Sequence, residues 1–228
     1  MKLLKLLTLG FSLIVITSCF SQRITLNPDK KSGNVSINYT FSDDDFEILS
    51  LILSSAPVGG EAGTFDPSIL IDKKEFISYF QKMEVKELTL VKSDISRKVI
   101  DGVGYYTGAI VINFTDFEIL LNKFPASENG LGFKREGQVI TMEQKIEMGK
   151  MGDMETLDNY IDLVKADKPV WYKKFINDDF LIEIVLKKPF IQTRGVTLSS
   201  DKKTAKYSFK TADMIGSNRK DLDFMLKF

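Results

Sequence analysis

The sequence contains no histidine and a single cysteine, Cys19, among its 228 residues. Without histidine, Ser-His-Asp triads and imidazole zinc sites are excluded, and one cysteine alone makes no internal disulfide. Carboxylates, lysine and tyrosine are the side chains still available for acid–base chemistry. The composition therefore favours a protein that is not an enzyme and that has no metal ion or other cofactor.

An excess of positive charge is also lacking, because 31 Lys and Arg residues are balanced by 31 Asp and Glu residues. A chain of zero net charge has no strong field to attract nucleic acid. The sequence has no G-x-G-x-x-G, G-x-x-x-x-G-K-[ST] or G-x-S-x-G segment, so it lacks the usual nucleotide-binding and hydrolase motifs. We therefore expect no nucleic-acid partner.

The chain opens with two lysines, Lys2 and Lys5, an apolar run at residues 6–16, and then the small residues Thr17 and Ser18. This order is typical of the three regions of a secretory signal. A helix that crosses a bilayer needs about 20 apolar residues, roughly twice the length of this run. The sequence thus predicts that residues 1–18 are a signal peptide that is removed.

The end of this signal reads Ile16-Thr17-Ser18-Cys19, which resembles the lipobox of bacterial lipoproteins. The resemblance implies a diacylglyceryl group on the Cys19 thiol, cleavage before Cys19, and a fatty acid such as palmitate on the new amino terminus. Several acyl chains would hold the protein stably on the bilayer of the cell envelope. Phe20 follows the cysteine where the inner-membrane retention signal has aspartate, which favours the outer membrane. The alternative is an ordinary secretory signal with a chance cysteine.

The rest of the chain, residues 19–228, has no proline- or serine-rich linker and is expected to form one domain after a short tether at residues 19–23. Apolar residues alternate with polar ones, as in half-buried strands, at residues 24–26, 35–41, 85–95, 105–114, 131–134, 139–146, 180–186, 196–198, 205–209 and 222–228. Helical spacing predicts helices at residues 43–53, 72–83, 116–123 and 153–166. This order predicts an α+β fold: a mainly antiparallel, curved or sandwich-like sheet with several inserted helices.

A second resemblance is carried by the C-terminal quarter of the chain. An apolar strand is followed by Lys188-Pro189, a run to Gly195, the turn at residues 200–204, and the strands at residues 205–209 and 221–228. This pattern resembles the C-terminal half of LppM-like bacterial lipoproteins. The resemblance implies a sheet-rich envelope domain that binds a lipid or glycolipid, and it assigns no functional residue.

One predicted helix is apolar nearly all round, and its apolar residues include Phe46, Leu49, Ile52 and Leu53. Such a helix is either buried in a core or in contact with lipid. The first interpretation is a core helix under the sheet. The second is a flap, hinged at Gly59 and Gly60, that lines an apolar ligand cavity or contacts the bilayer.

Two groups of residues raise the question of a metal site. Asp43, Asp44 and Asp45 carry oxygens that suit Ca²⁺, but consecutive residues point in different directions, and a helix start favours acidic caps. A methionine series that ends at Met154 has the soft ligands that Cu(I) prefers, yet methionine is also a common core residue. The sequence therefore predicts helix capping and core packing, and no metal.

Together these patterns predict a non-enzymatic, membrane-anchored envelope lipoprotein that contacts the bilayer through acylated Cys19 and binds a lipid, glycolipid or other apolar ligand. The alternative is a structural or protein-interaction lipoprotein, such as an adhesin or assembly factor. The first function requires a ligand cavity, whereas the second requires an exposed apolar patch. No protein partner is indicated by the sequence.

Overall fold

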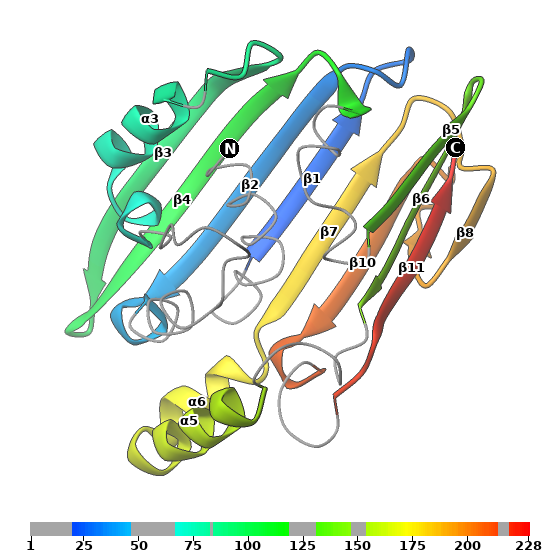
Figure 1. Cartoon of the computed structure of the whole chain (residues 1–228). Coiled ribbons are helices and arrows are strands. Elements are labelled where there is room, and N and C mark those ends of the chain that lie inside the picture. Colours follow the sequence, from blue (N-terminus) through cyan, green and yellow to red (C-terminus); the bar gives the residue numbers. More distant parts are fainter. Residues whose placement is uncertain (1–19, 47–66, 83, 119–130, 147–153, 214–218) are drawn as a thin grey trace.

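The computed structural model describes residues 20–46, 67–82, 84–118, 131–146, 154–213 and 219–228. These residues form two β-sheets with helices beside them (Figure 1). Sheet A has seven strands, in the spatial order β3 (Leu88–Ile100), β4 (Val103–Phe114), β2 (Gly33–Ser42), β1 (Phe20–Leu26), β7 (Asp179–Val185), β10 (Thr204–Lys210) and β9 (Thr197–Leu198). Sheet B has four, in the order β5 (Leu131–Glu136), β6 (Val139–Ile146), β11 (Leu222–Lys227) and β8 (Gln192–Arg194).

The predicted α+β class with mainly antiparallel sheets is confirmed. Every strand pair in the described residues is antiparallel except β1 with β7. The helical elements that lie wholly within the described residues are η2 (Pro67–Leu70), α3 (Lys73–Lys82), α5 (Met154–Asp167), α6 (Pro169–Phe175) and η4 (Thr211–Asp213). Figure 1 shows α5 and α6 together beyond one end of sheet A, and α3 beside β3.

The start of the chain differs from the expected tether at residues 19–23. Phe20 already pairs with Tyr39 of β2 and with Phe180 of β7, so residues 20–23 belong to the sheet. The alternation of the sequence predicted only residues 24–26 of this strand, because the polar but buried Gln22 interrupts the apolar pattern before them. Hydrogen bonds on both sides hold β1 in the interior of sheet A.

Sheet A is apolar on one face and polar on the other, as strand periodicity requires. In β2 the residues Val35, Ile37, Tyr39 and Phe41 are buried, while the residues between them are polar. Sheet B and η2 cover the apolar face: the Tyr207 and Phe224 rings lie 4.9 Å apart, and the Tyr39 hydroxyl donates a 2.7 Å hydrogen bond to the Leu70 carbonyl. The core is therefore a layer of aromatic and aliphatic side chains against one face of sheet A.

Local chemistry accounts for α3, which was predicted at residues 72–83. The Asp72 carboxylate accepts hydrogen bonds from the backbone N–H groups of Lys74 (2.7 Å) and Glu75 (3.2 Å). These are two of the N–H groups that a helix start leaves without intrahelical partners. Phe76 is the buried residue of this helix. None of the helices within the described residues has the length and apolar character needed to span a bilayer.

Gly108 of β4 lies directly opposite Tyr39, and the buried Tyr39 ring occupies the space where a Cβ would project. The ring is held by its hydrogen bond to Leu70, so it has little freedom to move. Gly108→Ala is therefore expected to lower the free energy of unfolding by about 2 kcal/mol through overpacking. Urea denaturation measures the loss. Ala109→Ser, whose side chain lies on the polar face, is the matched control; equal stabilities for the two variants would contradict the assigned packing.

Candidate functional site

A groove of about 510 Å³ runs across the polar face of sheet A. It crosses five strands, β3, β4, β2, β1 and β7, and the residues that line it are Ser21, Asn38, Tyr39, Thr40, Asp94, Ser96, Thr107, Gly108, Ala109, Asp179 and Leu181. Ser21, one of the lining residues, is the second residue of β1. The groove therefore lies next to the point where the chain enters the sheet.

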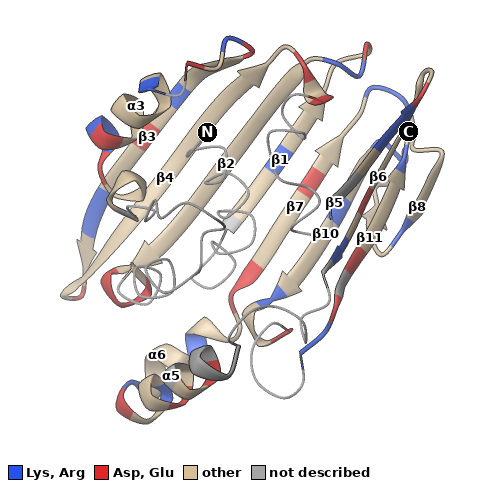
Figure 2. Cartoon of the chain, in the orientation of Figure 1, with Lys and Arg blue, Asp and Glu red and all other residues tan. Residues whose placement is uncertain are grey.

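Hydroxyl and amide side chains lie on the floor of the groove, among a larger area of apolar atoms. β2 and β4 contain no charged residue at all, as Figure 2 shows, and they contribute Asn38, Thr40 and Thr107. Ser96 and Thr107 share a hydrogen bond of 2.9 Å between their hydroxyl oxygens. These groups both donate and accept hydrogen bonds. Hydroxyl groups of a ligand could therefore form hydrogen bonds with these side chains.

Acidic residues lie at two sides of the groove, Asp94 on β3 and Asp179 on β7. The Asp94 carboxylate lies 3.0 Å from the Lys92 ammonium group and 3.7 Å from that of Lys73. The hydrogen bond and positive charge of Lys92, followed by the weaker effects of Lys73, lower the pKa of Asp94. Asp94 is therefore a charged hydrogen-bond acceptor at neutral pH.

A second polar feature lies on the same face, where Glu183 of β7 pairs directly with Arg23 of β1 and Lys206 of β10. The carboxylate is 2.6 Å from Arg23 and 2.9 Å from Lys206, and the Glu183 side chain is only 8% exposed. Burial by itself raises the pKa of Glu183, but the hydrogen bonds and charges of Arg23 and Lys206 outweigh it, so the pKa is lowered. These three residues, the Arg23–Glu183–Lys206 ladder, link three strands, and each of their charged groups is paired within the ladder.

Glu183→Gln is expected to lower the free energy of unfolding by about 1 kcal/mol at pH 7, since the cations are half exposed and screened by solvent. A carboxylate whose pKa is lower in the folded state stabilises the protein above its ordinary pKa of 4.5, and this contribution is lost as the pH falls through the folded value. The difference between the two proteins should therefore shrink below pH 4.5. Chemical denaturation across this pH range measures the difference in the free energy of unfolding, with Asp162→Asn on the exposed side of α5 as control. A difference that does not change with pH would contradict the stabilising role of the Glu183 carboxylate.

The three consecutive aspartates after β2 are separated by the structure. Asp45 accepts a 2.6 Å hydrogen bond from the Ser42 backbone N–H, and the Ser42 hydroxyl accepts one of 3.2 Å from the Asp45 N–H. This reciprocal pair is a capping box, which confirms the predicted capping role. Asp43 pairs with Arg97 at 2.7 Å, and Asp44 pairs with Lys168, the residue before α6.

The predicted site residues are mostly outside the described part of the chain. Cys19 and residues 49, 52 and 53 lie outside it, so acylation and the flap stay predictions. Phe46 is described: it is half buried and packs against the core, with ring centroids 6.0 Å from Phe41 and 5.8 Å from Tyr106. The methionines between residues 147 and 153 are also outside, whereas Met142 is buried in sheet B.

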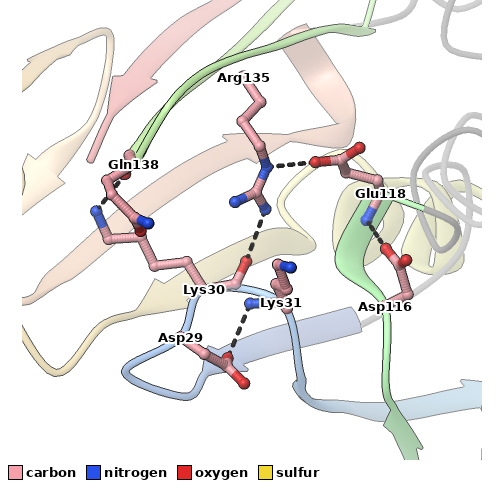
Figure 3. Close-up of polar contacts among 7 residues, drawn as sticks. All are labelled: Asp29, Lys30, Lys31, Asp116, Glu118, Arg135 and Gln138. Carbon is pink, nitrogen blue, oxygen red and sulfur yellow. Dashed lines mark hydrogen bonds and ion pairs between the residues drawn. The ribbon is translucent and has the colours of Figure 1, made fainter.

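A further polar cluster, shown in Figure 3, joins the turn between β1 and β2 to the β5–β6 hairpin. Arg135 donates a 3.2 Å hydrogen bond to the Lys30 carbonyl and forms an ion pair with Glu118. The Lys30 ammonium group donates to the Gln138 carbonyl at 2.9 Å. Asp29 accepts from the Lys31 N–H within the same turn. The cluster connects the two sheets and leaves the Arg135 side chain 19% exposed, which favours a structural role.

The described residues thus define an α+β protein with two packed sheets and a polar groove on the outer face of the larger one. No protein-family model matches the sequence, and no curated protein matches it. Among solved structures, the chain is similar to the folded domain of LppM from Mycobacterium tuberculosis, determined by NMR. The TM-score is 0.42 and the identity 14%, over 92% of this chain and 88% of that chain. A similarity at this level assigns neither a family nor a function.

Proposed function

We propose that this chain is a non-enzymatic bacterial envelope lipoprotein, held on the membrane by acyl chains on Cys19. The lipobox resemblance at residues 16–19 carries the proposal. Cleavage before Cys19 is compatible with the described strands, because it leaves each of them complete, β1 with its paired residue Phe20 included.

The domain is further proposed to bind a lipid or glycolipid from the same membrane, with the polar headgroup in the groove of sheet A. The hydroxyl and amide groups of Asn38, Thr40, Ser96 and Thr107 favour a ligand rich in hydroxyl groups. Ser21, two residues after the proposed anchor, also lines the groove. A headgroup at the membrane surface lies within reach of this position.

The anchoring proposal is tested by metabolic labelling with a fatty acid in a host that processes lipoproteins. The natural chain should carry the label, and Cys19→Ser should lose it completely, because serine offers no thiol for the diacylglyceryl group. Ser21→Ala, two residues later, is the control and should keep the label. Equal labelling of the Cys19→Ser protein, or no labelling of either protein, would show that the chain is not anchored in this way.

The ligand proposal is tested by native mass spectrometry of the mature protein purified from its own membrane. A non-covalent lipid or glycolipid is expected to accompany the natural protein. Asn38→Leu, which removes an amide group from the groove, should lower the affinity for the lipid about tenfold, the effect of losing roughly 1.4 kcal/mol of binding free energy, and so lower the fraction of protein that carries the lipid. Ser36→Ala on the same face of β2 lies outside the groove and should retain the ligand. A natural protein free of lipid would favour the structural or protein-interaction alternative.

A further inference from the structure

Exposed apolar side chains of the described residues gather at one end of sheet A. Seven large hydrophobic side chains are exposed, and two of them, Val91 and Ile191, lie at the other end of the strands. The remaining five come from the β3–β4 hairpin and from the two helices at the end of the sheet; they are Val99, Ile100, Val103, Leu163 and Val170. We call these five residues the apolar end.

The β3–β4 hairpin supplies three of them at its tip. Ile100 pairs with Val103 across a two-residue turn, Asp101-Gly102, in which both residues have positive φ angles. Val99 is 62% exposed and Ile100 54%. β-Branched residues favour the strand conformation, but a turn tip in water gains nothing from apolar side chains. Their exposure at this tip is consistent with an apolar or interfacial surrounding.

Helix α6 and Lys168, the residue before it, contact the same end of the sheet. The Lys168 ammonium group lies 2.6 Å from Asp44, and the Trp171 indole N–H donates a 2.7 Å hydrogen bond to Asp45, both just after β2. The Lys174 ammonium group lies 5.3 Å from the centre of the Tyr105 ring, near the start of β4. Val170, on the first turn of α6, is 86% exposed. Figure 1 shows α5, α6 and the hairpin tip at the lower end of sheet A.

The chain enters the sheet at this same end. Phe20 lies opposite Tyr39, which in turn lies opposite Gly108 of β4. The hairpin continues five residues beyond Gly108, to Val103, and therefore projects about 17 Å past the level of Phe20. The Cα atom of residue 19 is about 3.8 Å from that of Phe20, because the two residues are consecutive.

We propose that the apolar end is inserted into the surface of the bilayer that holds the acyl chains of Cys19. This inference rests on the proposed lipid anchor. With no tether between Cys19 and β1, a bilayer that receives the acyl chains lies within a few ångströms of the sheet end, and the hairpin tip projects further toward it. The polar headgroup layer is only about 5–8 Å thick on each side, so the tip passes into it and reaches its boundary with the hydrocarbon.

The contact is apolar rather than electrostatic. The charged residues of α5 are mainly acidic and those of α6 are lysines, so the two helices together carry no excess of basic charge (Figure 2). The apolar end should therefore contact a zwitterionic bilayer as well as an anionic one. Contact with a zwitterionic bilayer also distinguishes the apolar end from a basic patch, which binds acidic lipid headgroups.

The test places a fluorescent reporter at single positions of the mature, acylated protein. The natural cysteine is occupied by lipid, so an introduced cysteine is the only free thiol. Ile100→Cys and Val170→Cys report on the apolar end. Val91→Cys and Ile191→Cys, 57% and 60% exposed at the other end, are matched controls. Each protein is labelled with a nitrobenzoxadiazole dye and reconstituted into phosphatidylcholine vesicles, with and without lipids that carry a quencher on the acyl chain.

Labels at residues 100 and 170 should shift their emission to shorter wavelength and lose more than half of it to the quencher, while both control labels stay unchanged. An acylated protein whose labels at 100 and 170 are not quenched overturns the inference, as does quenching of the controls instead. A blue shift without quenching indicates contact with a second copy or another protein, and also overturns it.

The intact mass of each protein, measured before reconstitution, distinguishes a failure of the lipid anchor from a failure of the proposed insertion. A mass without acyl chains contradicts the anchor itself, and with it the inserted end. A mass with acyl chains and no quenching contradicts only the insertion of the apolar end. The four substituted positions are exposed, so loss of the fold is not the expected cause of any difference; circular dichroism of each variant checks this.

Discussion

The pairing of β1 on both sides is the constraint on which the larger sheet depends. β1 is antiparallel to β2 and parallel to β7, so it joins the N-terminal strands to the C-terminal ones. On the polar face the pairing is reinforced by the Arg23–Glu183–Lys206 ladder, and on the apolar face by the buried side chain of Ile24. Without β1, the β3–β4–β2 and β7–β10–β9 groups would share no backbone hydrogen bonds.

The same strand sets the geometry of the proposed function. A strand that begins one residue after the proposed anchor leaves no flexible chain between membrane and domain. The polar groove, the helices α5 and α6, and the exposed tip of the β3–β4 hairpin then have defined positions relative to the bilayer. An anchor on a long tether would allow the domain to rotate freely, and neither the groove nor the apolar end would have a preferred orientation.

Individual helices and strands show which features the sequence patterns predicted and which they missed. The capping spacing of Asp72 and Glu75 predicted α3, because a helix cap depends on neighbours within one helical turn. Helix α6 was missed, although Pro169 at its first turn is a local signal that favours a helix start. Strand β3 extends to Ile100, beyond its predicted end at residue 95, because its exposed final residues lack the alternation of a half-buried strand. The groove was not predicted, since its residues come from five strands.

By itself the sequence determined the local features: strand alternation, helix caps, the α+β class, and the expectation of an acylated Cys19. These depend on residues a few positions apart, whose spacing sets the side-chain direction. Only the tertiary structure decided that β1 pairs with β7, that the groove crosses β3 to β7, and that the exposed apolar residues of α5, α6 and the β3–β4 hairpin share one end. The physical reason is that contacts between residues as far apart as Arg23 and Glu183 depend on the folding of the whole chain, and no local pattern encodes them.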